Sequence, residues 1–172
     1  KFIYREQVVN NKYLTYINND IQYGSRYIVK RLIDIIVSIF ALVLLFPLFL
    51  SVYTYLLFVD GRPVIIKQNR VGLHGKPFNM YKYRTMKNDS HTERGSLEEL
   101  NTHSGPLFKI DDDPRLLKGA KKLRRWSLDE LPQFINVLKG DMSVVGPRPL
   151  FVEDSENFNR EYLRRLNVLP GI

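Results

Sequence analysis

The sequence predicts an α+β fold: a small, mainly helical domain that associates with a membrane and contains one β-hairpin. Three observations lead to this prediction. Residues 32–59 form an apolar run that is interrupted by a single charge. Residues 63–68 and 77–86 have the composition of two short strands around a glycine-containing turn. Residues 116–126 interleave leucines with basic residues, which is typical of an amphipathic helix at a membrane interface.

The length, cysteine content and charge of the chain limit the classes of protein to which it can belong. The chain has 172 residues, which is the length of one domain. It contains no cysteine, which excludes a disulfide framework and a thiolate metal site. Its net charge of +8 and isoelectric point near 9.7 predict attraction to polyanions, such as nucleic acid, anionic lipid headgroups or phosphorylated substrates. Charge alone does not choose among these partners.

We divide the chain into three parts. Residues 1–29 are rich in tyrosine and asparagine, without clean periodicity or a signal-peptide pattern, and we interpret them as a peripheral leader. Residues 30–60 form a membrane helix, and residues 61–172 form a cytoplasmic domain. The first residue is Lys1 rather than Met, so we expect the chain to be part of a longer protein.

The apolar run from Leu32 to Val59 is long enough to cross a bilayer, which requires ~20 apolar residues. Pro47 divides it into two limbs, and each limb would be ~20 Å long as a helix, too short to cross by itself. A kinked transmembrane helix, a re-entrant hairpin and a buried core helix are the alternatives. Basic residues flank both ends, so the positive-inside tendency places both ends on the cytoplasmic side and favours the hairpin. The flanking residues are Lys30, Arg31, Arg62, Lys67 and Arg70.

The two predicted strands are joined by residues 70–76, whose glycines mark the turn. Because side chains alternate along a strand, every second residue of the later strand shares one face. That face carries Phe78, Met80, Lys82 and Arg84. Lys82 and Arg84 therefore continue an apolar row, and they either point into a site or lie at a solvated strand end.

The polar segment that follows contains a predicted loop and three consecutive aspartates. Residues 88–106 include two glycines and predict a loop that could act as a lid. Asp111 and Asp113 fit the Asp-X-Asp pattern with which many nucleotide-sugar glycosyltransferases hold a divalent metal, although Asp113-Pro114 is also a common turn start. The histidines of the chain have no partner at metal-ligand spacing, so we interpret them as surface residues. They are His74, His91 and His103.

Residues 116–126 carry five basic residues among the leucines and end in Trp126. We expect this segment to lie against anionic headgroups and to present Arg124 or Arg125 to a phosphate. A nucleic-acid surface is the competing interpretation, but no helix-turn-helix, aromatic RNA platform or zinc motif accompanies the charge. We therefore expect no nucleic-acid partner.

Two adjacent carboxylates, Asp129 and Glu130, precede a short amphipathic helix that ends at Lys139-Gly140. Ser127 and Glu130 have the spacing of a capping box, in which both side chains serve only to cap the helix. Pro132 argues against this interpretation, because it would then interrupt the helix interior. We predict that the helix begins at Asp129, which places both carboxylates at the positive end of the helix dipole, where phosphate or a divalent metal can gather. The apolar stripe consists of Leu131, Phe134, Ile135 and Leu138.

Two further segments complete the chain. Residues 146–149, Gly-Pro-Arg-Pro, fix the backbone on both sides of Arg148. A guanidinium held in this way can grip phosphate oxygens through two parallel hydrogen bonds, and a rigid turn with an exposed arginine is the alternative. Residues 151–166 predict a polar surface or interfacial helix.

Residues 127–133 and 136–149 closely resemble motifs of the bacterial sugar transferases that are monotopic phosphoglycosyl transferases. The resemblance extends from Lys30 to Ile172, and Lys82 and Thr85-Met86 also match the family pattern. Members of this family transfer a phosphosugar from a nucleotide diphosphate sugar to polyprenyl phosphate. The resemblance implies a re-entrant helix in one membrane leaflet, with its break at Pro47. The family pattern continues beyond Ile172, so we expect a further C-terminal piece.

These residues and the resemblance together imply a mechanism. Asp129 would attack the β-phosphorus of a UDP-sugar, release UMP and carry the phosphosugar covalently until polyprenyl (undecaprenyl) phosphate accepts it. Mg²⁺ on Asp129 would offset the repulsion between the two anions. Arg148, Lys82 and Arg124 would hold the substrate phosphates. Glu130 would orient the metal or transfer a proton.

The implied enzyme catalyses the first membrane step of polysaccharide, capsule or glycoconjugate assembly, at the cytoplasmic face of the bacterial inner membrane. Its partners are the UDP-sugar, polyprenyl phosphate and membrane lipid, and residues 61–172 form its catalytic domain. Two other functions stay open: a direct metal-dependent glycosyltransferase that uses Asp111 and Asp113, and a non-catalytic module that binds anionic membranes. The sequence names neither the sugar nor the polymer, and it leaves open whether the chain forms a homo-oligomer.

Overall fold

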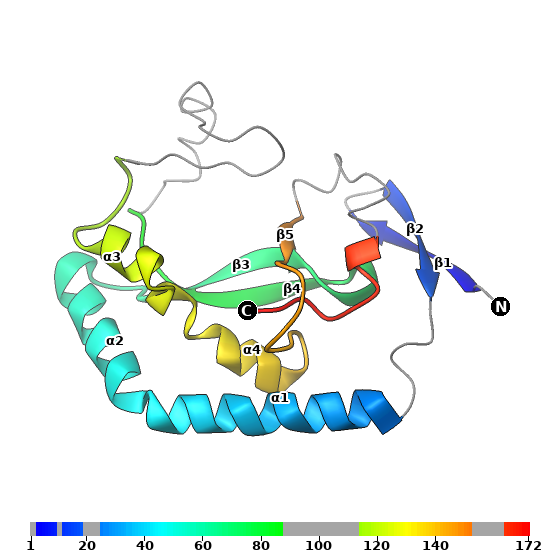
Figure 1. Cartoon of the computed structure of the whole chain (residues 1–172). Coiled ribbons are helices and arrows are strands. Elements are labelled where there is room, and N and C mark those ends of the chain that lie inside the picture. The colour runs from blue at the N-terminus through cyan, green and yellow to red at the C-terminus, as the bar shows by residue number, and fades with distance from the viewer. Residues whose placement is uncertain (1–2, 10–11, 19–24, 88–113, 153–163) are drawn as a thin grey trace.

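Two helices joined by a sharp bend form the base and one side of the molecule (Figure 1). In the computed structural model, helix α1 (Ser25–Leu44) is followed directly by α2 (Phe46–Asp60), and the two are bent by 62°. Pro47 lies in the first turn of α2, where its missing N–H group costs no helical hydrogen bond. The predicted break is therefore confirmed as a bend. The structure describes residues 3–9, 12–18, 25–87, 114–152 and 164–172.

Neither helix alone combines the length and apolar composition needed to cross a membrane, whereas the bent pair together passes both criteria. Helix α1 begins at Ser25, five residues before the predicted start of the membrane segment at Lys30. The first turns of α1 contain polar and basic residues, and the apolar run that starts at Leu32 continues the same helix.

Helix α1 has an inverted distribution of polar and apolar side chains. Asp34 and Ser38, one turn apart, are buried, and α1 packs along α4 (Gln133–Lys139). Most of its large apolar side chains are exposed instead, which is the opposite of the pattern in a helix of a soluble domain. The residues that are more than half exposed include Ile28, Leu32, Ile33, Ile36, Phe40 and Val43.

The central sheet has three antiparallel strands in the order β4-β3-β5. Strands β3 (Ile65–Val71) and β4 (Pro77–Tyr83) pair around a short 3₁₀ turn, η2 (Leu73–Gly75), so the predicted hairpin is confirmed. His74 lies in this turn with a positive φ of 56°. Strand β5 (Leu150–Phe151), which the sequence does not predict, extends the other edge of β3.

Phe151 corrects the prediction of a helix over 151–166. It is a strand residue, paired with Arg70, and the Arg70 guanidinium carbon lies 3.3 Å from the centre of its ring. This contact favours an extended backbone over a helical one at that position. Residues 153–163 of the predicted helix lie outside the described residues, and 164–165 are helical.

A second hairpin precedes α1. Strands β1 (Ile3–Val9) and β2 (Lys12–Asn18) pair in antiparallel register, from Ile3 opposite Asn18 to Val9 opposite Lys12. In Figure 1 this hairpin lies at the end of the molecule opposite α2. The predicted leader therefore contains regular structure, which its mixture of tyrosine, asparagine and charged residues does not reveal by alternation.

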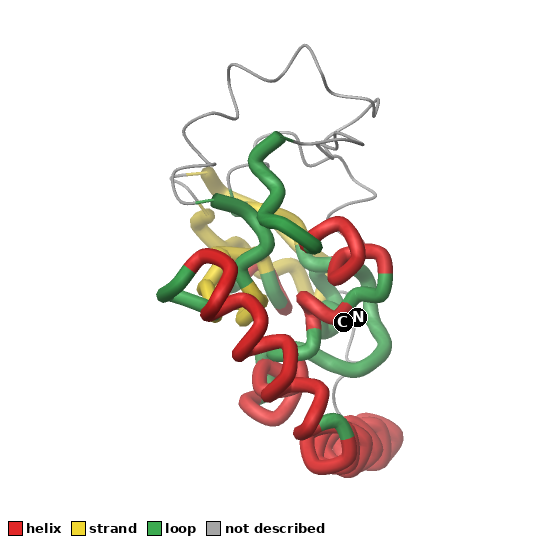
Figure 2. Tube along the Cα trace, turned by 90° about the vertical axis from the view of Figure 1, so that its left-hand side faces the viewer, coloured by secondary structure: helices red, strands yellow, loops and turns green. Residues whose placement is uncertain are grey.

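The main core lies between α2, the sheet and residues 114–131. Tyr83 of β4 is buried there and donates a hydrogen bond of 2.9 Å to the carbonyl of Phe49 in α2. Burial, with a smaller contribution from Tyr53, raises the pKa of Tyr83 to about 12, so the hydroxyl stays protonated and available as a donor. Figure 2 shows α1 end-on at the base and α2 rising from it. The core side chains include Val52, Leu56, Val64, Leu117, Ala120, Leu123 and Leu131.

The basic segment after residue 114 forms one short helix, α3 (Ala120–Arg125). Its inner side is anchored by Ala120 and Leu123, which are buried, whereas its basic side chains and Trp126 are exposed. The predicted amphipathic character is confirmed. Its contact with a membrane stays a prediction.

Candidate active site

Asp129 lies in a tight 3₁₀ turn, η4 (Leu128–Glu130), and not in the first turn of α4. The prediction that the helix begins at Asp129 is therefore wrong, because α4 begins at Gln133. Pro132 has no N–H group to bond the carbonyl of Leu128, so the chain continues through i to i+3 hydrogen bonds before the α-helix starts. Ser127 has a φ of +53° and makes no side-chain cap, which confirms that this segment is not a capping box.

The carboxylate of Asp129 is buried and paired with one cation. Lys82 Nζ lies 2.7 Å from Asp129 Oδ2, and the two side chains are 12% and 3% exposed. Apart from this ion pair, Oδ2 has no hydrogen-bond partner among the described residues. Lys82 therefore offsets the charge of Asp129, and no second donor competes for Oδ2 among the described residues.

A second ion pair extends the first toward solvent. Glu130 Oε1 lies 3.8 Å from Lys82 Nζ and 3.3 Å from a guanidinium nitrogen of Arg148. Exposure rises along this row, from 3% for the Asp129 side chain to 17% for Glu130 and 64% for Arg148. The four side chains thus form a row of alternating charge from the interior to the surface, and we call it the charged row.

Asn136 of α4 fixes Lys82 beside Asp129. Its side-chain oxygen accepts a hydrogen bond of 2.8 Å from the Tyr81 N–H, and its side-chain nitrogen donates one of 2.7 Å to the Asn79 carbonyl. Both groups belong to the free edge of β4, so the buried amide replaces a neighbouring strand. Met80, between them, packs with Val137 of α4 and with Met142, and Phe78 of the predicted apolar row packs against the same cluster.

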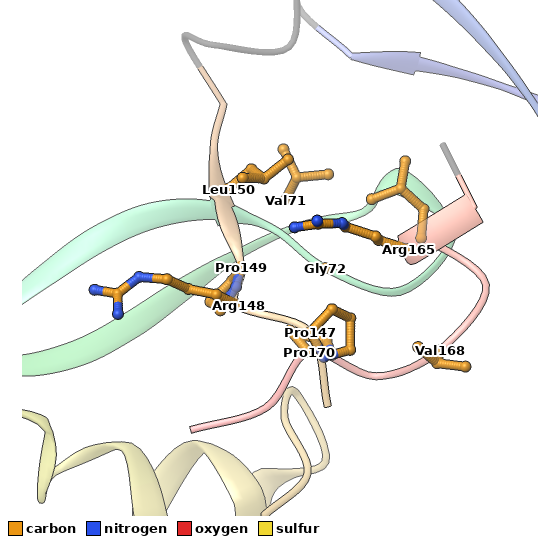
Figure 3. Close-up of a pocket in the computed structure, with 10 residues that line it drawn as sticks. Val71, Gly72, Pro147, Arg148, Pro149, Leu150, Arg165, Val168 and Pro170 are labelled. Atoms are coloured by element: carbon orange, nitrogen blue, oxygen red, sulfur yellow. The ribbon is translucent and has the colours of Figure 1, made fainter. Parts of the chain in front are cut away.

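Arg148 is held by the C-terminal segment of the described chain. Gly171 N–H donates a hydrogen bond of 2.9 Å to the Pro147 carbonyl, and Ser143 N–H donates one of 2.8 Å to the Pro170 carbonyl. A Cβ atom added to Gly171 would lie 2.3 Å from the Gly146 nitrogen, so only glycine allows this approach. Figure 3 shows the Arg148 side chain extending away from Arg165 and Pro170.

Helix α1 supports the same loop from below. Asp34 accepts hydrogen bonds from Ser143 Oγ at 2.9 Å and from the Val144 N–H at 3.1 Å, and its partner one turn earlier is Lys30. Arg31 donates to the carbonyls of Val137 and Leu138 at the end of α4. Sequence reasoning missed these roles. The signal was a Lys30–Asp34 pair at i, i+4, in which Asp34 is the single charge of the apolar run.

The comparison with known proteins names the family. The model of the family described as bacterial sugar transferase matches residues 25–172. The chain belongs to this family. The match includes α1 and α2, the loop that carries Arg148, and all four residues of the charged row.

Three relatives illustrate how similar this bacterial sugar transferase is to known proteins and how much of each relative it covers. The galactosyl transferase CpsE of Streptococcus agalactiae is 50% identical over 113 residues, which cover 66% of this chain and 25% of the relative. The undecaprenyl-phosphate galactose phosphotransferase of Salmonella typhimurium is 37% identical over 179 residues, 99% of this chain and 36% of the relative. The UDP-glucose:undecaprenyl-phosphate glucose-1-phosphate transferase of Klebsiella pneumoniae is 40% identical over 152 residues, which cover 87% of this chain and 30% of the relative. The chain spans 25% to 65% of the length of the curated relatives that it matches.

The other predicted site residues lie elsewhere. Arg124 is exposed on α3 and makes no ion pair within the described part of the chain. Arg84, predicted on the face of Lys82, turns to the end of α2, where its guanidinium lies 2.9 Å from the Asp60 carboxylate and donates to the Asp60 carbonyl. The predicted lid, His91, His103 and the three aspartates of 111–113 lie outside the described residues.

The carboxylates of Asp129 and Glu130 are compatible with Mg²⁺. Within the described ranges, no group of three or more His, Cys, Asp or Glu side chains could hold a metal ion. Mg²⁺ needs few protein ligands, however, because it keeps waters and is commonly bound by one or two carboxylates together with substrate phosphates. Asp129 Oδ2, which is buried and ion-paired with Lys82, lies next to the carboxylate of Glu130, and two adjacent carboxylates fit such a shared site.

Proposed function

We propose that this bacterial sugar transferase is a phosphoglycosyl transferase that moves a phosphosugar from a UDP-sugar to polyprenyl phosphate and releases UMP. The observation that carries the proposal is the buried Asp129 carboxylate, paired with Lys82 and continued by Glu130 and Arg148. The names of the relatives from Salmonella typhimurium and Klebsiella pneumoniae describe sugar-phosphate transfer to undecaprenyl phosphate and support the same reaction class.

In the first step, a carboxylate oxygen of Asp129 attacks the β-phosphorus of the UDP-sugar. A P–O bond forms to this oxygen, the bond from the β-phosphorus to the bridging oxygen breaks, and UMP leaves with the electron pair. The product is a phosphosugar joined to Asp129 as an acyl phosphate. Because Asp129 is almost completely buried, water has little access to this reactive intermediate.

In the second step, an oxygen of polyprenyl phosphate attacks the same phosphorus. The P–O bond to Asp129 breaks, which regenerates the carboxylate and leaves a diphosphate linkage between sugar and lipid. Both attacking groups are anions, so neither step needs a proton to be removed. We therefore assign Glu130 to orienting Arg148 and to binding Mg²⁺ with Asp129, rather than to proton transfer.

Cations must offset the repulsion between the attacking anion and the diphosphate. Arg148, at the exposed end of the charged row, is the first cation of the row that an incoming diphosphate meets, and it can exchange Glu130 for phosphate oxygens. Lys82 would then neutralise charge next to Asp129. Bound Mg²⁺ would supply further positive charge at the diphosphate. We assign Arg124, exposed on α3, to the phosphate of the lipid acceptor.

We also propose that α1 and α2 form a re-entrant hairpin at the cytoplasmic face of the bacterial inner membrane. The exposed apolar face of α1 supports this proposal, because an apolar surface of this extent is unfavourable in water. The pair is bent by 62°, which is compatible with a re-entrant hairpin, and basic residues flank the apolar run on both sides, which favours the hairpin over a kinked transmembrane helix. A hairpin in one leaflet would bring the phosphate of polyprenyl phosphate to the level of the charged row.

Intact-protein mass spectrometry tests the proposal. The purified full-length protein is incubated with Mg²⁺ and a panel of UDP-sugars in the absence of lipid acceptor, beside Asp129→Asn and the surface control Lys67→Gln. We expect a mass gain of one phosphosugar in the wild-type protein and in the control but not in Asp129→Asn. Polyprenyl phosphate should then remove the added mass.

The same experiment distinguishes the competing functions. Release of UDP instead of UMP, without an adduct and with full activity of Asp129→Asn, would indicate direct glycosyl transfer through Asp111 and Asp113. UMP release only when lipid is present, without an adduct, would indicate that Asp129 is a metal ligand and not the nucleophile. Absence of any nucleotide release from the full-length protein would indicate a non-catalytic module.

A further inference from the structure

A cavity lined by both apolar and charged side chains lies between the first turns of α1, the start of the 143–149 loop and residues 168–169. It has a volume of about 320 Å³ and opens to the surface beside the first turns of α1. None of the residues of the charged row lines it. Its walls come from α1, from the start of the loop and from the C-terminal segment. The lining residues are Arg26, Tyr27, Lys30, Arg31, Asp34, Ser143, Val145, Val168 and Leu169.

The polar wall of this cavity carries an excess of positive charge. Its charged side chains are three cations and one carboxylate, so the formal charge is +2. Lys30 is held by Asp34 and by Ser143 Oγ, and Arg31 is held by two carbonyls of α4. Asp34 therefore offsets the charge of Lys30, and the excess positive charge of the wall lies on Arg26 and Arg31. Arg31 is fixed in position without a counter-ion among the described residues, which is a favourable arrangement for binding an anion.

Arg26 completes this wall. It is exposed and makes no ion pair within the described part of the chain, so its guanidinium is available to a ligand. Tyr27, its neighbour, adds a phenolic group that can donate a hydrogen bond.

The rim of the cavity is apolar and continuous with the exposed face of α1. Val145, at the rim, is 75% exposed, and Val168 also remains partly exposed. The nearest outward side chains of α1, Ile28 and Val29, are more than half exposed. A ligand that fills this cavity would thus place an anionic group against Arg26 and Lys30 and an apolar group against α1.

We propose that this cavity binds the phosphodiester headgroup of an anionic membrane phospholipid, such as phosphatidylglycerol, with its acyl chains along the exposed face of α1. The proposal rests on the proposed insertion of α1 in the membrane. The combination of a cationic wall and an apolar rim matches a lipid and not a free phosphate ion. The bound lipid would stabilise the Asp34–Ser143 contact and hence the loop that carries Arg148.

Native mass spectrometry of the full-length protein released from nanodiscs tests this site. The nanodiscs contain phosphatidylglycerol and phosphatidylcholine, and retained lipid is counted for the wild-type protein, Arg26→Gln and Arg62→Gln. Arg62 is a matched control, because it is an exposed cation at the other end of the helix pair and outside the cavity. We expect one retained phosphatidylglycerol in the wild-type protein and in Arg62→Gln, and a loss of about fivefold in Arg26→Gln.

Three results would overturn the proposal. Equal losses in Arg26→Gln and Arg62→Gln would show that the membrane charge attracts the protein without a site. Equal retention of phosphatidylcholine and phosphatidylglycerol would show that the headgroup charge is not recognised. Displacement of the retained lipid by one equivalent of polyprenyl phosphate would show that the cavity belongs to the acceptor.

Lipid retention is read independently of catalysis. Thermal unfolding of both variants verifies that they are folded, and adduct formation on Asp129 is measured beside the lipid count. We expect the adduct in both variants, since neither residue belongs to the charged row. An adduct with no retained phosphatidylglycerol in the wild-type protein would reject only the lipid site, whereas retained lipid without an adduct would reject only the proposed reaction.

Discussion

At the scale of single residues, the site depends on one carboxylate that is buried with its counter-ion. Lys82 Nζ and Asp129 Oδ2 are 2.7 Å apart, and both side chains are largely removed from water. Each charge therefore lowers the free-energy cost of burying the other. A buried ion pair of this kind adds little net stability compared with apolar side chains. We infer that the pair is present for the chemistry of the carboxylate.

Removal of Lys82 alone should therefore be costly. Lys82→Met leaves the Asp129 carboxylate buried without a counter-ion, and we expect the free energy of unfolding to fall by about 3 kcal/mol. The double variant Lys82→Met/Asp129→Leu should recover most of this loss, because an apolar pair replaces the charges. Chemical denaturation measures both values. If the double variant were as unstable as the single variant, the two charges would not depend on each other.

Asn136 offers a second test at this scale. Asn136→Leu keeps the volume but leaves the Tyr81 N–H and the Asn79 carbonyl without a partner at the edge of β4. We expect a loss of about 2 kcal/mol of stability and slower formation of the Asp129 adduct, because Lys82 follows the movement of its strand.

The matched control for this substitution is Asn69→Leu, an exposed asparagine on β3. Stability and adduct rate should be close to wild type in this control. An Asn136→Leu protein that forms the adduct at the wild-type rate would show that Asn136 stabilises the fold without positioning Lys82.

At the scale of secondary-structure elements, three segments meet at the loop that carries Arg148. Helix α1 holds Ser143 and Val144 through Asp34, β3 holds Pro149 through Arg70, and the C-terminal segment holds Pro147 through Gly171. A loop fixed at three points would lose little entropy in the proposed binding of a phosphate group by Arg148. The loop is therefore an ordered element, although its backbone has no regular secondary structure.

Gly171→Ala tests this arrangement. The added Cβ would lie 2.3 Å from the Gly146 nitrogen, which is backbone and cannot rotate away. We expect a loss of about 2 kcal/mol of stability and a higher KM for the UDP-sugar, because the loop and Arg148 are displaced together. Ile172→Ala, one residue further, is the control. An unchanged KM together with lower stability would separate the C-terminal segment from substrate binding.

At the scale of the whole molecule, many of the exposed large apolar side chains of the described residues lie on α1. Polar contacts of this helix point into the protein and its apolar side chains point out, so a lipid environment would satisfy both sides. The core itself is formed by α2, the sheet and residues 114–131, and does not need α1 for its apolar packing.

Single cysteines report the topology directly, since the chain contains none of its own. We expect Ser25→Cys and Arg62→Cys to react with an impermeant maleimide in inside-out vesicles and not in right-side-out vesicles. Leu44→Cys, at the bend, should be protected in both, because the bend would lie within the bilayer. Labelling of the two ends from opposite sides would show a transmembrane helix instead of a re-entrant hairpin.

The parts of the fold that depend on neighbouring residues are predictable from the sequence. The bend at Pro47, the hairpin of β3 and β4, and the amphipathic segment around Leu123 each follow from local composition and spacing. Strand β5 is not predictable in this way, because two residues become a strand only when β3 presents its edge. The prediction that the helix starts at Asp129 is wrong for a local reason, since Pro132 converts the expected first turn into 3₁₀ geometry.

The candidate site likewise combines features that the local sequence shows with contacts that only the folded chain brings together. The sequence by itself determined that Asp129 and Glu130 are adjacent, that Arg148 is rigidly framed and that three cations are available for phosphates. Only the tertiary structure decided which cations meet the carboxylates: Lys82 reaches Asp129 and Arg148 reaches Glu130, whereas Arg124, the nearest in sequence, stays exposed on α3. The physical reason is that this choice depends on the docking of β4 and the loop on α4, which is set by hydrogen bonds between residues far apart in the chain, such as Asn136 to Tyr81.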